Sequence, residues 1–151
     1  MTSRQDRPSR QANTSRQANT SRQQSLDQAG LATRREVLGD DYVDAALSQV
    51  DDFSWPMQEL VTRNCWNDIW NRPGLARPTR SLINIGMLVA LNRPHELKVH
   101  LRGALNNGCS EEEIREVLLQ CVPYCGFPAA IDGLRVAREV IAAYKEEQAG
   151  G

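Results

Sequence analysis

Residues 81–91, SLINIGMLVAL, are apolar on nearly every side of a helix, and they constrain the fold more than any other segment. A helix of this kind has to be covered all round, so we expect it at the centre of the molecule. Elsewhere, apolar residues recur at helical spacing between Leu26 and Tyr144, and no useful length shows the alternation of a strand. The pattern predicts an all-α bundle of about six to seven helices.

Capping and turn residues predict where these helices begin and end. Gly39 is a natural stop for a first helix, and Pro56 suits the first turn of a helix that runs to about Trp70. Asn92 is expected to cap the helix that follows the apolar segment. Ser110 to Glu113 form a capping box that begins the next one, which Pro123 is expected to disturb.

The helix that ends near Trp70 has an unusually wide apolar face. A neighbouring row on this face holds Trp66 and Trp70. The main row, spaced by four residues, consists of Met57, Val61, Cys65 and Ile69. This face exceeds what one groove within a chain usually needs. It is either core or, in part, a contact with another subunit.

The chain of 151 residues has the length of one domain. Residues 1–25 repeat the hexapeptide SRQANT, carry a net charge of +4 and have almost no apolar side chain, so we expect a disordered tail. Residues 26–151 are predicted to form one helical domain. This body carries a net charge of −5, which argues against a nucleic-acid surface.

The four cysteines and two histidines do not have the spacing of a zinc site, so no metal is expected. In the absence of a signal peptide, free thiols in the cytoplasm are the simplest interpretation. The longest apolar run is far too short to cross a bilayer, so no membrane partner is expected.

Three residues with acid, base or anion-binding chemistry share one helix face. Arg93, Glu96 and His100 are spaced i, i+3, i+7. A glutamate one turn before a histidine can accept from the ring N–H, select the tautomer and raise the pKa of the imidazole. The alternative is an exposed pair of residues that stabilises the helix only slightly.

Three further side chains carry open alternatives. Arg80 begins the apolar helix, where it either pairs with an acid or binds an anionic ligand. Cys121 and Cys125 lie one helical turn apart and are either inert core residues or a reactive pair.

Four motifs occur in order through the body of the chain: W-x-x-x-W-x-R-P-G-L from residue 66, T-R-S-L from residue 79, E-L-K-x-H-L-R from residue 96 and Y-C-G-x-P-A-A from residue 124. On these motifs the chain resembles the carboxymuconolactone decarboxylase family, across residues 32–140. The resemblance implies an alkylhydroperoxidase D-like helical fold and a ring-shaped homo-oligomer, a hexamer. It also implies decarboxylation of 4-carboxymuconolactone to the 3-oxoadipate enol-lactone, in the protocatechuate branch of aromatic catabolism.

The peroxidases of this superfamily carry C-x-x-C followed four residues later by a histidine. Here the histidine is kept as His100, but Arg93 and Glu96 stand at the two cysteine positions. Because Arg and Glu cannot form a disulfide, the peroxidase interpretation loses its essential chemistry unless Cys121 and Cys125 substitute. A thiol-dependent peroxidase or disulfide reductase therefore stays an alternative, as does a catalytically silent oligomeric binding protein.

The implied substrate is a lactone dicarboxylate that can itself accept the electron pair left behind by the departing CO2, so no cofactor is expected. The resemblance then gives His100, oriented by Glu96, the role of proton donor or oxyanion partner. Arg80 and Arg93 would hold the two carboxylates, and Tyr124 and Cys125 would line the pocket.

Overall fold

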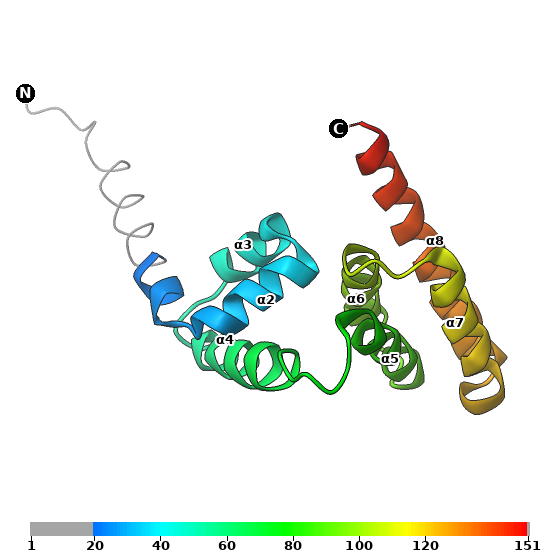
Figure 1. The fold of residues 1–151 in the computed structure, drawn as a ribbon, viewed down its shortest axis with the longest axis horizontal. Coiled ribbons are helices and arrows are strands. Elements are labelled where there is room, and N and C mark those ends of the chain that lie inside the picture. The colour runs from blue at the N-terminus through cyan, green and yellow to red at the C-terminus, as the bar shows by residue number, and fades with distance from the viewer. Residues whose placement is uncertain (1–19, 151) are drawn as a thin grey trace, which may run out of the picture. The chain divides into compact units, whose positions relative to one another are not determined.

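The computed structural model describes residues 20–150, and every regular element in this part of the chain is a helix (Figure 1). Residues 20–25 are helical, and eight elements follow: α2 Gln28–Leu38, α3 Asp40–Ser48, α4 Trp55–Leu60, the π-helix η1 Val61–Ile69, α5 Arg77–Ala90, α6 Pro94–Asn106, α7 Glu111–Cys125 and α8 Phe127–Ala149. The predicted all-α class is confirmed. None of the helices in residues 20–150 has the length and apolar character needed to cross a membrane.

The chain divides into two compact units, and the described part of the first comprises residues 20–34 and 40–71. Here α4 continues directly into η1, and the rings of Trp66 and Trp70 stack with their centroids 5.0 Å apart. Both indoles are buried, whereas Met57 and Ile69 of the other predicted row are 65% and 52% exposed. The tryptophans therefore belong to the core, and the exposed apolar row is the one without them.

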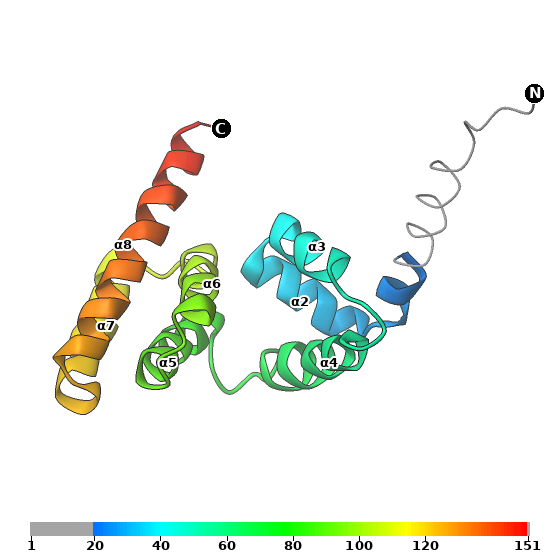
Figure 2. The same cartoon turned by 180° about the vertical axis from the view of Figure 1, so that it is seen from behind.

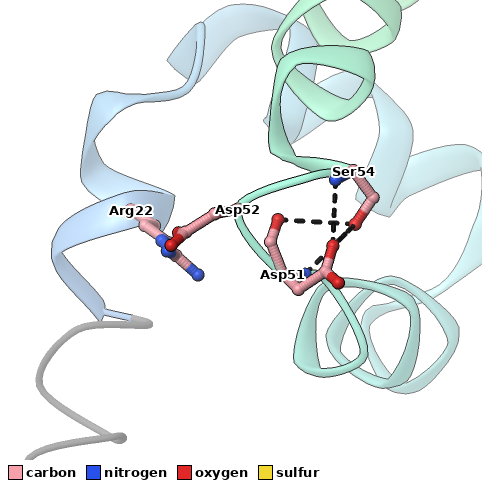
Figure 3. A network of polar contacts seen from close by, with 4 residues as sticks. All are labelled: Arg22, Asp51, Asp52 and Ser54. Atoms are coloured by element: carbon pink, nitrogen blue, oxygen red, sulfur yellow. Dashed lines mark hydrogen bonds and ion pairs between the residues drawn. The ribbon is translucent and has the colours of Figure 1, made fainter.

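The start of the first unit is tied down by polar contacts (Figure 3). Arg22 forms an ion pair with Asp52, and the carboxylate of Asp51 accepts hydrogen bonds from the backbone N–H and hydroxyl of Ser54, at 2.9 and 2.7 Å. The predicted disordered tail extends to residue 25, whereas the structure describes residues 20–25 as helical. The remainder of the predicted tail, residues 1–19, lies outside the described residues.

The second unit comprises residues 35–39 and 72–150 of the described chain. Within it α5 packs against α6 and α7, and α8 packs against α6 and α7 (Figures 1 and 2). Its core is aliphatic, with Ile85, Leu101, Ile114 and Leu118 at most 1% exposed. The helix over the apolar segment buries Ser81, Ile85 and Val89. Ile83, Met87 and Leu91 are 45%, 50% and 66% exposed, so the prediction that this segment is covered all round at the centre is wrong for the single chain. One helical domain over residues 26–151 stays a prediction.

Two of the predicted helix ends can be compared directly with those in the structure. The capping box is present: the side chain of Ser110 accepts from the N–H of Glu113 at 3.1 Å, and the Glu113 carboxylate accepts from the N–H of Ser110 at 2.7 Å. Pro123 does not end α7, which continues through Cys125. Both cysteines of the 121/125 pair therefore lie on one helix.

Candidate active site

A tight turn joins α5 to α6 and determines where the first candidate residues lie. Asn92 has the left-handed φ of 52°, and its N–H donates to the carbonyl of Val89 at 3.1 Å. The N–H of Arg93 donates to the carbonyl of Leu88 at 3.0 Å, which completes a Schellman motif. Asn92 therefore ends α5 instead of capping α6, and Arg93 occupies the N-cap position.

The two helices run antiparallel, so residues near the end of α5 face residues near the start of α6. At the other end of this hairpin, the side-chain amide of Asn107 donates to the hydroxyl of Ser81 at 2.9 Å. Between the two ends, the amide nitrogen of Asn84 lies 3.4 Å from Nδ1 of His100. His100 is thus placed midway along the hairpin, against α5.

His100 is half-buried, and burial lowers the pKa of its imidazole. The charge of Glu96 acts in the opposite direction but is the smaller effect. The sequence-based expectation that Glu96 raises the pKa is therefore right about the sign of its contribution and wrong about the net result. With a pKa below the usual 6.5, His100 is mainly neutral at pH 7.

Arg80 lies one helical turn before Asn84 on α5, about 6 Å along the helix axis, and so shares its face. One Nη donates to the backbone carbonyl of Arg72 at 2.9 Å, while Nε is buried without a hydrogen-bond partner in the described chain. None of the carboxylates in residues 20–150 forms an ion pair with Arg80. Of the two alternatives for this residue, an internal acid partner is therefore excluded within residues 20–150.

Glu96 and Arg93 lie at the opposite end of the hairpin and are exposed. Seven residues separate Arg93 from His100, which corresponds to about 10 Å along the axis. Arg80 and Arg93 consequently flank His100 from opposite sides along the hairpin.

Tyr124 and Cys125 lie at the C-terminal end of α7. The tyrosine is 80% exposed and the cysteine half-buried. In residues 20–150, no hydrogen bond or ion pair joins either of them to His100, Glu96 or the candidate arginines. Their role as lining residues stays a prediction.

The free thiols offer little support for redox chemistry. Burial raises the pKa of Cys121, and its hydrogen-bonded neighbour Cys125 adds to the increase. Because the thiolate is the reactive form, a raised pKa makes Cys121 a poor nucleophile at neutral pH. In the described chain, no three His, Cys, Asp or Glu side chains converge as metal ligands.

Two hollows of the surface, both lined by described residues, lie away from these side chains. One of about 570 Å³ lies in the first unit and includes Asp27, Glu59 and Arg63 in its lining; another of about 410 Å³ lies along α8 between Ile131 and Glu139. Neither hollow is lined by a histidine, a cysteine or any predicted site residue. We place the candidate site at the α5–α6 hairpin, because the half-buried imidazole of His100 and the guanidinium of Arg80 both lie on these two helices.

Asn84 is the site residue that the sequence-based prediction missed. It interrupts the apolar segment 81–91. A polar residue within a helix that is otherwise apolar all round needs a hydrogen-bond partner, and this signal could have identified it.

The described chain is all-helical, and its candidate site holds a histidine and two arginines. Residues 56–139 match the model of the carboxymuconolactone decarboxylase family. The chain is 43% identical over 111 residues to the 4-carboxymuconolactone decarboxylase of Acinetobacter baylyi, which covers 74% of this chain and 83% of that protein. It is also 43% identical over 112 residues to the nitrosuccinic acid decarboxylase of Metarhizium robertsii, with 74% and 78% covered. The protein belongs to the carboxymuconolactone decarboxylase family.

Proposed function

We propose that the protein is a carboxy-lyase that converts 4-carboxymuconolactone to the 3-oxoadipate enol-lactone with release of CO2. The observation that carries this proposal is the similarity to a decarboxylase of that substrate over 83% of the relative's length. The hairpin supports it chemically, because it combines a mainly neutral imidazole with an arginine that has no acidic partner in the described chain. The reaction belongs to the protocatechuate branch of aromatic catabolism.

The reaction needs no metal or organic cofactor, because the substrate accepts the electrons itself. The bond between the ring carbon and its carboxylate breaks, CO2 leaves, and the electron pair moves through the ring C=C to the lactone carbonyl. The resulting dienolate takes up one proton, derived in net balance from the medium, at the carbon next to that carbonyl. The protein has to hold two carboxylates and stabilise an oxyanion.

His100 is the group that stabilises the oxyanion. A neutral imidazole that gave up its proton completely would become a strongly basic imidazolate, whereas its N–H can donate a hydrogen bond to the developing charge at little cost. Of the two roles considered for this residue, oxyanion partner is favoured over proton donor by the lowered pKa. Glu96 contributes its charge one helical turn away.

Arg80 holds the acetate arm of the substrate. Its buried Nε–H lacks a partner in the described chain and can complete a two-point contact with a carboxylate. The departing carboxylate is better placed against an apolar wall, since a cation would hold it back. Arg93 is the second candidate, and Tyr124 and Cys125 line the pocket in this proposal.

A second substrate is favoured by the equal identity, 43%, to the nitrosuccinic acid decarboxylase. Nitrosuccinic acid and 4-carboxymuconolactone both contain a succinate unit whose departing carboxylate lies on a carbon next to an electron-accepting group. In one case the acceptor is a nitro group and in the other the unsaturated lactone. A site built for the shared succinate unit could act on either.

The test is CO2 release by the purified, chelator-treated protein from 4-carboxymuconolactone and, in parallel, from nitrosuccinic acid. Release from the lactone at the higher kcat/KM supports the first proposal, and the reverse order assigns the second. His100→Ala is expected to lower turnover of the true substrate by about 10²-fold. Absence of release from both would contradict the proposal and favour a silent binding protein.

The protein is a ring-shaped homo-oligomer, a hexamer, in this proposal. Support comes from large apolar side chains that are at least 45% exposed on α5, α7 and α8: Ile83, Met87, Leu119, Tyr124, Phe127 and Ile131. Exposed apolar groups on this scale are typical of contact surfaces. Light scattering at micromolar concentration checks the assembly, and a monomeric mass would contradict it. A cytoplasmic location is supported by the four free thiols.

A further inference from the structure

Asn84 is a polar side chain on the central face of an otherwise apolar helix. A buried amide costs free energy unless it forms hydrogen bonds, so its position calls for a specific partner. Its amide nitrogen faces Nδ1 of His100 at 3.4 Å, from the neighbouring helix of the hairpin. Both residues are half-buried.

We propose that Asn84 is a positioning residue that holds His100 in the neutral tautomer with its proton on Nε2. The imidazole then presents an N–H donor to the lactone oxyanion that forms as CO2 leaves. This second step rests on the proposed function, whereas the tautomer itself does not.

The hydrogen-bonding capacity of the two groups carries the argument. The amide nitrogen of asparagine only donates, so the ring nitrogen that faces it has to accept through a lone pair. A neutral histidine with a lone pair on Nδ1 carries its proton on Nε2. The imidazolium form has N–H groups on both nitrogens. Its Nδ1–H would face the N–H of the Asn84 amide, and two donors cannot form a hydrogen bond with each other.

Two further influences act on the same ring. Burial also disfavours the charged form and lowers the pKa of His100, while Glu96 acts against it. Asn84 differs from both because it distinguishes between the two ring nitrogens. Burial selects the neutral state, and the amide selects which neutral tautomer is present.

The tautomer matters because one ring nitrogen accepts from Asn84 and only the other can then donate to an oxyanion. With Nδ1 accepting from Asn84, Nε2 carries the proton, and in this proposal Nε2–H donates to the oxyanion. A carboxylate in place of the amide would accept from Nδ1–H instead, and Nε2 would lose its proton or the whole ring would become charged. Asn84→Asp is therefore the informative substitution, since it nearly preserves shape and reverses the direction of the hydrogen bond.

The chain offers a direct readout because it contains only two histidines. His95 is exposed on α6, and His95→Gln leaves His100 as the single imidazole. Nitrogen NMR of ¹⁵N-histidine-labelled full-length His95→Gln protein at pH 7 is expected to show a protonated Nε2 and an unprotonated Nδ1. A protonated Nδ1 in this protein would overturn the proposal.

The same measurement on His95→Gln with Asn84→Asp is expected to show a protonated Nδ1. Asn64→Asp, on the exposed surface of η1, makes the same chemical change away from His100 and is expected to leave both nitrogen signals as they were. An unchanged spectrum in the Asn84→Asp protein, with circular dichroism that shows it folded, would also overturn the proposal.

Kinetics then test the use of the tautomer. Asn84→Asp is expected to lower kcat by about 10²-fold with KM changed much less, because the lost interaction forms mainly in the transition state. Equal kcat values for Asn84→Asp and the parent would overturn the role in oxyanion binding. If the parent releases no CO2 but shows the Nε2–H tautomer, the proposed function fails and the positioning by Asn84 stands.

Discussion

The two units of the protein bury different kinds of side chain. The core of residues 72–150 is almost entirely aliphatic, and Ser81 is its one buried polar residue in the described chain. The unit formed by residues 20–34 and 40–71 buries Thr33, Arg34 and Thr62 along with Trp66 and Trp70. The difference shows that buried polarity by itself does not mark a functional site.

Two of the three buried polar residues of the first unit have hydrogen-bond partners within it. The hydroxyl of Thr33 donates to Asn71 at 2.8 Å, and the guanidinium of Arg34 donates to Gln58 at 2.9 Å. In the second unit the polar pair of Asn84 and His100 is only half-buried and lies along an aliphatic frame. Rigid apolar packing beneath an accessible ionisable group is the arrangement that suits catalysis.

The largest expected effect is a loss of stability from a substitution in the aliphatic core of residues 72–150. Leu101 is fully buried next to His100 on α6, and Leu101→Ala should lower the free energy of unfolding by about 3 kcal/mol through lost burial and a cavity. Urea titration measures the change. Leu91→Ala, at a side chain 66% exposed, is the matched control and should cost far less. Equal losses of unfolding free energy in the two variants would contradict the contrast between the buried core and the exposed surface.

In the first unit, the corresponding stability prediction concerns Gly30, where α2 approaches η1 closely. A Cβ added at Gly30 would lie 2.1 Å from the carbonyl oxygen of Thr62, a backbone atom that cannot move aside easily. Gly30→Ala should therefore destabilise the protein by about 2 kcal/mol. Gly86→Ala is the control, because its nearest neighbour would be Val117 at 3.8 Å and alanine favours a helix. Thermal unfolding measures both, and a stable Gly30→Ala protein would refute the steric argument.

The lowered pKa of His100 predicts how turnover depends on pH. The folded pKa lies below the usual 6.5, so the neutral imidazole persists at pH 7 and is lost only as the pH falls through that lower value. Below it, kcat should fall by about 10-fold per pH unit. An acid limb centred above pH 6.5 would show that Glu96 outweighs burial. A pH profile of kcat on the preferred substrate measures this.

The smallest expected effect concerns a hydroxyl in the first unit. The side-chain oxygen of Thr62 is buried without a hydrogen-bond partner in the described chain, so Thr62→Val should be neutral or stabilise by up to about 1 kcal/mol. Thr33→Val is the counterpart, since it removes hydrogen bonds to Ala29 and Asn71 and should destabilise by about 1 kcal/mol. Chemical denaturation of both variants measures the difference. A loss at Thr62 as large as that at Thr33 would show that its hydroxyl is satisfied.

Helix ends show how far local sequence carries a prediction. The capping box at Ser110 was predicted correctly because its donors and acceptors lie within four residues of one another. Asn92 was predicted to cap α6, but it ends α5 in the left-handed conformation. Asparagine suits both positions, and only the chain path between the two helices decides between them.

The apolar rows of α4 and η1 show where periodicity is insufficient. Two neighbouring rows were visible in the sequence, and either could have faced inward. The stacked pair of Trp66 and Trp70 is buried, while Met57 and Ile69 are exposed. The buried tryptophans therefore do not support a contact with another subunit, whereas the exposed row of the same face leaves that prediction open. The exposed side chains of α5, α7 and α8 add to its support in the proposal.

The sequence by itself determined the helical class, the family and the candidate residues, because periodicity, capping and motifs are local properties of the chain. The tertiary structure decided which of those residues meet. The pairing of Asn84 with His100 arises from two helices laid antiparallel. The net pKa shift of His100 likewise depends on how much solvent the packed helices exclude, which outweighs the neighbouring charge that the sequence displays.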